Sequence, residues 1–213
     1  LTRIYADYTN NFVLGFASFG GITAGVVASN PENKGILDIK SARAISKLVS
    51  FCDSFALPVL TLVDSEGILI DEANENMPFA AELSKLAFAY SSTETAKVTV
   101  VLGKAYGSAF TLMGSKSIGA DVAFALESAK ISIMSPRSAV AFLCNERVAK
   151  KSREEIEASW AAENAAPVKA AIHGEIDDII TASELRQRIC AAISMLASKC
   201  NGAPDRRHAN MPL

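Results

Sequence analysis

The stretch from Val98 to Gly119, VTVVLGKAYGSAFTLMGSKSIG, decides how the rest of the chain is interpreted. It opens with a run of apolar, mostly β-branched residues, which is typical of a buried strand. Gly103 interrupts this run, so we expect the strand to end there. The residues from Tyr106 to Phe110 then predict the start of a helix that ends near Gly114.

This strand–turn–helix unit would bring several backbone N–H groups to one point. The first amides of a helix have no partner within the helix, and the positive end of the helix dipole lies beside them. Such a point can hold an anion or a developing oxyanion. The alternative is a tightly packed strand–helix turn that carries no chemistry.

Strands and helices alternate along the whole chain. Apolar runs predict strands at 12–19, 22–28, 57–63, 98–102, 121–126, 130–134 and 176–180. Amphipathic patterns predict helices at 38–52, 77–90, 106–114, 135–143, 151–163, after Pro167, and at 181–199. The alternation is typical of an α/β fold with one continuous core, which we expect to form a single domain over residues 1–213.

Two local patterns refine this fold. Gly20-Gly21 between two apolar runs predicts a β-hairpin. A strand–strand–helix unit occurs at 12–52 and recurs, less regularly, near 121–143. Repeated units of this kind stack into a short superhelix rather than a doubly wound sheet.

Composition narrows the class of protein. Half of the 213 residues are hydrophobic, 21% are charged, and the formal net charge is −2, which argues against a nucleic-acid or membrane-surface protein. No apolar run reaches the roughly 18 residues that span a bilayer. The four cysteines are far apart and show no metal-ligand spacing, so we expect reduced core residues and a cytoplasmic location. A first residue of Leu rather than Met predicts a piece of something longer.

Other constellations give weaker signals. Ser108 could act as a nucleophile only with a histidine base, and His173 is the plausible partner because His208 lies in a polar tail. Capping of the helix by the Ser108 hydroxyl is the more ordinary role. Two distant histidines predict no metal site. Glu175 with Asp177-Asp178 could bind a cation, although such a cluster is more often a solvated turn or a helix cap.

Twelve stretches, in order and over essentially the whole chain, resemble the C-terminal half of the carboxyltransferase subunit of biotin-dependent acyl-CoA carboxylases and the related decarboxylases. They are Gly15–Ala17, Phe19–Gly21, Gly25–Ala28, Phe51–Asp53, Pro58, Leu62–Asp64, Lys97–Val100, Lys104–Phe110, Ser115–Lys116, Gly119–Asp121, Ile176–Ile180 and Arg207–Leu213. The resemblance implies a crotonase-like fold of stacked ββα turns. It also implies that this chain is the C-terminal domain, which mainly holds biotin, and that an N-terminal half holds the acyl-CoA.

The resemblance assigns roles to particular residues. It implies an oxyanion hole formed by the backbone amides of Ser108 and Ala109, which would act on biotin and need no acid or base side chain. The further contacts that it implies are with biotin at Tyr106, Gly107, Glu66 and Gly67, and with the acyl group at Phe110, Thr111 and Ile68. The family usually has Gly where Ser108 stands, and Asp-x-Pro-Gly-Phe where this chain reads Asp64-Ser65-Glu66-Gly67-Ile68.

The resemblance also implies partners. Biotin would arrive on a carrier protein or domain, coenzyme A would be part of the substrate, and a biotin carboxylase subunit could belong to the same assembly. We expect a homo-oligomer, as a trimer or a dimer of trimers. The alternatives are a decarboxylase subunit of the methylmalonyl- or glutaconyl-CoA type, or a catalytically degenerate domain that serves assembly.

Overall fold

A single mixed sheet organises the chain in this computed structural model, which describes residues 1–72, 78–143 and 152–199. Within these residues the sheet has eight strands: seven follow the order β1-β2-β3-β4-β5-β6-β8, and β7 pairs with β5 off this path. The strands are β1 (Thr2–Ile4), β2 (Phe12–Phe19), β3 (Ile22–Ser29), β4 (Val59–Ser65), β5 (Lys97–Tyr106), β6 (Val122–Leu126), β7 (Lys130–Ser132) and β8 (Asp178–Ile180). Strands β1 to β3 are antiparallel, and the pairings from β3 onward are parallel.

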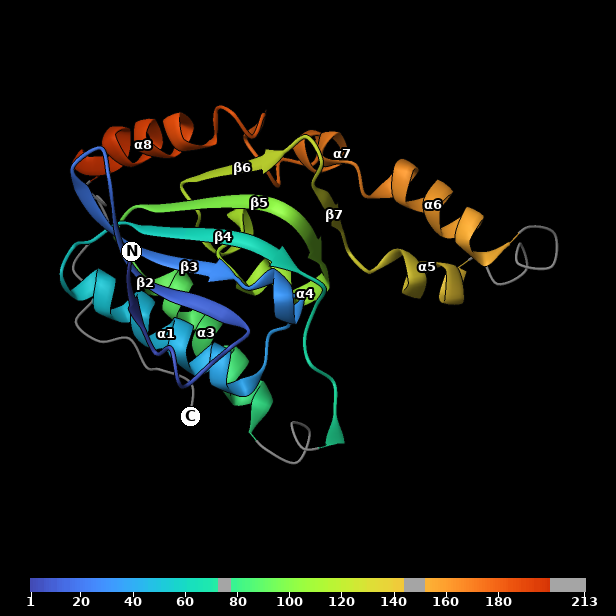
Figure 1. The fold of residues 1–213 in the computed structure, drawn as a ribbon, viewed down its shortest axis with the longest axis horizontal. Coiled ribbons are helices and arrows are strands. Elements are labelled where there is room, and N and C mark those ends of the chain that lie inside the picture. The colour runs from blue at the N-terminus through green and yellow to red at the C-terminus, as the bar shows by residue number, and fades with distance from the viewer. Residues whose placement is uncertain (73–77, 144–151, 200–213) are drawn as a thin grey trace.

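Helices cover both faces of this sheet (Figure 1). They are α1 (Ile39–Ser54), α3 (Phe79–Ser92), α4 (Gly107–Leu112), α5 (Pro136–Leu143), α6 (Arg153–Asn164), α7 (Pro167–Ile172) and α8 (Leu185–Met195). One core cluster packs the sheet against α1 and α3, and a second packs the other face against α8. Helices α5 and α6 extend away from the sheet in Figure 1. No helix in the described part of the chain is long and apolar enough to cross a membrane.

The predicted hairpin is confirmed. Strands β2 and β3 pair along their full lengths, from Phe12 opposite Ser29 to Phe19 opposite Ile22. Gly20 and Gly21 form the two-residue turn with φ angles of 59° and 87°. Glycine adopts such left-handed conformations without the steric cost that a Cβ atom imposes.

Strand β5 is longer than the sequence predicts, because Gly103 does not end it. The strand continues to Tyr106 and is shared between two neighbours: residues 98–101 pair with β6, and residues 104–106 pair with β7. The glycine has a different role. A Cβ atom at position 103 would lie 2.5 Å from Oδ1 of Asp64, the atom that accepts a hydrogen bond from the Lys104 amide at 2.8 Å. Gly103 therefore makes room for this carboxylate.

Most other predicted elements are confirmed, with shifted ends. Asp38 caps α1 by accepting a hydrogen bond from the Ser41 amide at 2.8 Å. The last predicted helix is shorter than expected, since α8 begins only at Leu185. Strand β1 had no sequence signal that we recognised. The predicted helix starts at 77 and 151 and the polar tail 201–213 lie outside the described residues.

The cysteine prediction is only partly confirmed. Cys52 is a fully buried free thiol in α1, and burial raises its pKa to about 11. A Cβ atom at position 25 would overlap the Cys52 sulfur, which explains why a glycine faces it. Cys190 is a free thiol that is only partly buried. Cys144 and Cys200 lie outside the described residues.

Candidate active site

The turn between β5 and α4 has the predicted strand–helix form. Tyr106 is the N-cap residue of α4, and Gly107 follows with a φ of 63°. A side chain at position 107 would be strained in this conformation, and its Cβ would lie 3.3 Å from the carbonyl oxygen of Ile133. The left-handed glycine turns the chain sharply from the strand into the helix.

The amides of Ser108 and Ala109 belong to the first turn of α4, where backbone N–H groups have no partner within the helix. The Ser108 side chain is exposed, whereas Ala109 and Phe110 are buried and belong to the core cluster under α1 and α3. No side chain caps the helix, so the capping role considered for the Ser108 hydroxyl is wrong. The turn therefore offers backbone N–H groups rather than a capping hydroxyl.

The loop that follows β4 lies beside this turn, because β4 and β5 are parallel neighbours and Ser65 pairs with Ala105. Glu66 forms an ion pair with Lys104 at 2.5 Å and a longer one with Lys34 at 3.7 Å. The hydrogen bond from Lys104 lowers the pKa of Glu66, and the same bond raises the pKa of Lys104. Two adjacent strand ends are thus joined by a charged pair.

The other residues that the resemblance singles out lie on the same two segments. Gly67 has a φ of 141°, and the Leu37 amide donates a hydrogen bond to its carbonyl at 3.0 Å. Ile68 forms an isolated bridge with Leu37 and is partly buried. Tyr106 is only 6% exposed, and burial raises its pKa. Thr111 is exposed on α4.

The Ser–His pair considered for a hydrolase does not form here. His173 is the exposed C-cap residue of α7, and within the described residues no hydrogen bond joins it to Ser108. In the carboxylate cluster considered as a cation site, Asp177 forms contacts with neighbouring elements. Asp177 pairs with Lys116 at 2.9 Å and accepts a hydrogen bond from the Ala123 amide at 2.8 Å.

Asp178 forms an ion pair with Arg188 of α8 at 3.2 Å. No group of three or more His, Cys, Asp or Glu side chains in the described part of the chain is arranged to hold a metal ion. The two aspartates tie the start of β8 to neighbouring elements through ion pairs, a role that differs from the solvated turn or helix cap considered as the alternative.

Sequence reasoning missed the charged pair that links the two loops. Lys104 belongs to a stretch that resembles the family, but the sequence analysis assigned no contact to it or to Lys34. The signal was present in the residue order, since Asp64 and Glu66 follow one parallel strand and Lys104 lies near the end of the next. The carboxyl ends of neighbouring parallel strands meet at one edge, so such residues are candidates for contact.

The sheet, with one strand shared between two neighbours and an amide turn at the end of that strand, defines a crotonase-like α/β domain. Its solved structural neighbours include the transcarboxylase 12S subunit with methylmalonyl-coenzyme A bound, at a TM-score of 0.92 and 32% identity over 99% of this chain and 42% of that one. The beta subunit of a Pseudomonas aeruginosa geranyl-CoA carboxylase, at 17% identity and a TM-score of 0.81, shares the fold.

The chain belongs to the carboxyl transferase domain family, whose model matches residues 1–211. It is 36% identical to the carboxyltransferase subunit of Haloferax mediterranei propionyl-CoA carboxylase and 38% identical to the human mitochondrial propionyl-CoA carboxylase beta chain, over 99% of its length in both cases. It is 35% identical to the alpha subunit of Propionigenium modestum methylmalonyl-CoA decarboxylase over 97% of its length. The chain spans 42%, 39% and 41% of these relatives.

Proposed function

We propose that this chain is the biotin-binding, C-terminal-type half of a carboxyltransferase that moves a carboxyl group between carboxybiotin and a short acyl-CoA. The observation that carries the proposal is the turn at the start of α4, where the amides of Ser108 and Ala109 have no partner within the helix, in a chain of this family. The acyl-CoA would be held by an N-terminal half, and residues 1–213 would form one domain.

The role of this chain in the reaction would be to stabilise negative charge. Carboxybiotin, when bound, would supply the carboxyl group from a ureido nitrogen and would leave negative charge on the ureido oxygen. The amides of Ser108 and Ala109 would donate hydrogen bonds to that oxygen at the positive end of α4. Backbone donors need no proton transfer and no reorganisation, which agrees with the absence of a Ser–His pair in the described residues.

The surrounding residues would shape the two halves of the site. We assign contacts with biotin to Tyr106 and Gly107 and to the Glu66–Gly67 loop, which the Lys104 ion pair holds beside the turn. Thr111 and Ile68 would face the acyl group. Phe110 is buried in the core cluster, so it would act on the acyl group through the position of α4.

The region formed by β7, α5 and α7 supports a role in assembly. Large apolar side chains are exposed on β7, α5 and α7 or beside them: Ile133, Phe142, Leu143, Val168 and Ile172. Large exposed apolar patches mark sites of interaction with other proteins or with membranes. We propose that this region packs against the N-terminal half within a trimer or dimer of trimers, and the related transcarboxylase 12S subunit forms a hexamer.

The partner components would set the direction of the reaction. A biotin carrier would deliver the cofactor in every case, and a biotin carboxylase subunit would drive carboxylation. The identity to a methylmalonyl-CoA decarboxylase subunit supports the opposite direction as a second candidate, with the same half-reaction at the same turn.

Substitutions at Ser108 test the proposal. Ser108→Pro removes one amide in the first turn of α4, where no hydrogen bond within the helix is lost, and it should lower kcat for carboxyl exchange between the biotin carrier and propionyl-CoA by about 10²-fold. Ser108→Ala keeps the amide and should retain activity. The protein is assayed as its complete carboxyltransferase assembly, with circular dichroism to check the fold.

The opposite outcomes are equally clear. Loss of activity in Ser108→Ala would indicate a nucleophilic serine, and full activity in Ser108→Pro would remove the amide from the mechanism. An assembly that neither binds biotin nor exchanges a carboxyl group with any short acyl-CoA would be a degenerate assembly domain, and the proposal would be wrong.

A further inference from the structure

Helix α4 is held in place without any group that covers its first turn. It has six residues and no side-chain cap at its N-terminal end, so the amides of Ser108 and Ala109 stay available to a ligand. At 1.5 Å per residue the helix is roughly 9 Å long. A helix this short is not stable alone in water, so its position depends on contacts at its other end.

Buried hydroxyl groups meet the chain where α4 ends. Gly114 follows the C-cap residue Met113 and has a φ of 72°. The Gly114 carbonyl accepts a hydrogen bond from the Thr99 hydroxyl at 2.5 Å, and the Thr111 carbonyl accepts one from the Ser115 hydroxyl at 3.0 Å. Thr99 is 1% exposed and Ser115 is 4% exposed. The carbonyls at this end of α4 are therefore bonded inside the core.

Two further buried side chains surround the Thr99 hydroxyl. Thr99 of β5 pairs with Thr61 of β4, so their side chains lie on the same face of the sheet. The Thr61 hydroxyl forms a hydrogen bond of 2.9 Å with the hydroxyl of Tyr90 in α3, and both residues are buried. A Cβ atom at position 114 would lie 2.9 Å from Tyr90 Cε1 and 3.2 Å from Thr99 Oγ1. A glycine at 114 therefore lets the end of α4 lie against this group.

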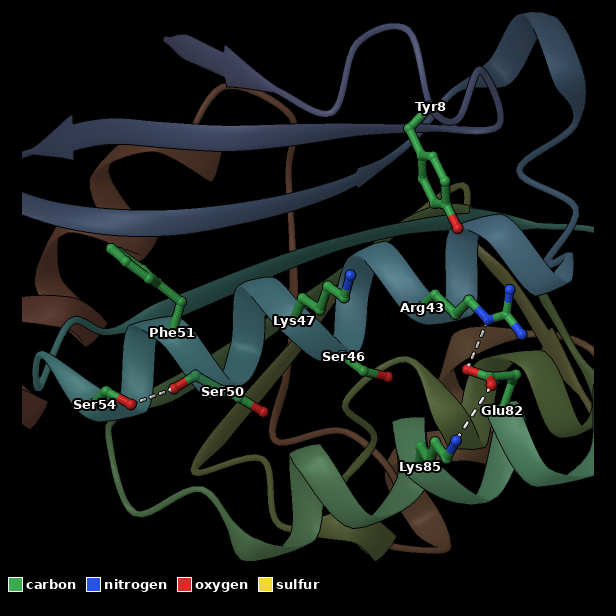
Figure 2. Close-up of a pocket in the computed structure, with 9 residues that line it drawn as sticks. All are labelled: Tyr8, Arg43, Ser46, Lys47, Ser50, Phe51, Ser54, Glu82 and Lys85. Carbon is green, nitrogen blue, oxygen red and sulfur yellow. Dashed lines mark hydrogen bonds and ion pairs between the residues drawn. The ribbon is translucent and has the colours of Figure 1, made fainter. Parts of the chain in front are cut away.

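Helix α3, which carries Tyr90, is itself anchored at its start. Glu82 in the first turn of α3 is 7% exposed, and it pairs with Arg43 of α1 at 3.1 Å and with Lys85 at 3.3 Å (Figure 2). The first ion pair joins α3 to α1, and the Tyr90 hydroxyl joins α3 to β4 near its other end. The helix behind α4 is thus fixed at both ends.

We infer that Thr99 is a positioning residue for carboxyl transfer. Through the Gly114 carbonyl it fixes the end of α4, and it thereby sets where the amides of Ser108 and Ala109 lie. Tyr90, which lies against Gly114, supports this arrangement from α3. The inference rests on the proposed function of these amides. Oxyanion donors act within a narrow range of distances, so a small displacement of α4 lowers the rate.

Removal of the Thr99 hydroxyl tests this inference in the complete carboxyltransferase assembly. Thr99→Val keeps the side-chain shape and should lower kcat for carboxyl exchange with propionyl-CoA by about tenfold. The KM for propionyl-CoA should stay within about twofold, because the N-terminal half would hold the CoA. Thr99→Ser restores the donor and should recover at least about half of the wild-type kcat. Tyr90→Phe is a milder variant, which should lower kcat by about threefold.

Thr93→Val is the matched control. The Thr93 hydroxyl is also buried and donates to a helix carbonyl, that of Ala89 at 2.6 Å. Thr93 lies beside Lys97, at the opposite end of β5 from the amide turn. Circular dichroism and thermal unfolding should show similar losses of stability in Thr93→Val and Thr99→Val, with a loss of kcat in Thr99→Val alone.

Three results would overturn the inference: a loss of kcat that Thr93→Val shares, an unchanged kcat in both Thr99→Val and Tyr90→Phe, or an equal loss in Thr99→Ser. If Thr99→Val does not fold, Tyr90→Phe decides. Ser108→Pro, assayed beside these variants, separates the two proposals. If it lowers kcat and Thr99→Val does not, only the positioning role is wrong. If it leaves kcat unchanged, the proposed function of the amides is wrong as well.

Discussion

Two lysines on the same strand show how differently the two ends of the sheet are built. Lys97 begins β5 and is 4% exposed, and its ammonium group donates to the carbonyls of Tyr90 and Thr93 at 2.7 and 2.8 Å. Lys104, near the other end, has a side chain that is 47% exposed and pairs with Glu66. Burial lowers the pKa of Lys97, whereas the hydrogen bond to Glu66 raises the pKa of Lys104.

The two ends of β5 therefore differ. We call the Lys97 end closed, because its lysine is buried, and the Lys104 end open, because its lysine is exposed. At the Lys97 end the backbone is locked further, since Asp121 accepts a hydrogen bond from the Lys97 amide at 2.8 Å and pairs with Lys199 at 3.1 Å. Lys97 also satisfies carbonyls at the C-terminal end of α3, which otherwise would be buried without partners. At the other end, the Lys104 side chain is held by a partly exposed ion pair with Glu66, and the loop after β4 is also fixed by the hydrogen bond from the Leu37 amide to the Gly67 carbonyl.

The largest expected effect comes from breaking the closed end. Lys97→Met keeps most of the side-chain volume but leaves the Tyr90 and Thr93 carbonyls without their donor. We expect a loss of about 2–3 kcal/mol in the free energy of unfolding, which is the cost of orphaned buried polar groups. Urea unfolding at neutral pH measures the change.

Lys104→Met is the matched control at the open end. Exposed ion pairs contribute about 0–1 kcal/mol, so this variant should lose clearly less stability than Lys97→Met. Equal losses in the two variants would mean that the ends of β5 are not built differently, and the comparison would fail.

A smaller effect is expected at the turn after the open end. Gly107→Ala places a Cβ in a left-handed conformation, close to the Ile133 carbonyl, and should cost about 1–2 kcal/mol of stability. It should also lower carboxyl exchange, because the amides that follow would shift. Gly174→Ala is the control, since Gly174 has a similar φ of 74° but an unobstructed Cβ position.

The two glycine variants separate strain from position. Both carry the cost of a left-handed alanine, which thermal unfolding measures. Only Gly107→Ala should also lower kcat, and an equal loss of kcat in Gly174→Ala would show that the amide turn is not the sensitive element.

The sequence predicted the fold well where local chemistry decides it. The Gly20-Gly21 turn and the apolar β4 run each depend on residues close in the chain, and both are confirmed. Gly103 was misinterpreted because its reason is not local: the Asp64 carboxylate from the neighbouring strand occupies the space of its side chain. Periodicity carries no information about such a contact.

The candidate site shows the same limit. The order of residues at 106–110 predicted a strand–helix turn with unpaired amides, and the turn is present. The ion pair between Glu66 and Lys104 joins residues 38 positions apart, so it depends on β4 and β5 being neighbours. Sheet order is a property of the whole chain, and no single stretch contains it.

The smallest effect concerns that ion pair and carries a pH signature. The hydrogen bond from Lys104 lowers the pKa of Glu66 below its ordinary value of 4.5. The ion pair therefore stabilises the folded state above that pH, and this stabilisation is lost as the pH falls through the pKa of Glu66 in the folded state. Glu66→Gln should therefore cost about 0.5 kcal/mol at pH 7, and less at high salt, because both side chains are partly exposed.

Urea unfolding of the Glu66→Gln and wild-type proteins at pH 7 and at about pH 3.5 measures this difference, and it should shrink at the lower pH. Glu32→Gln is the matched control, since Glu32 is exposed on the 3-10 helix Pro31–Asn33 and forms no ion pair among the described residues. A difference that persists unchanged in acid would mean that Glu66 holds the loop by packing rather than by charge.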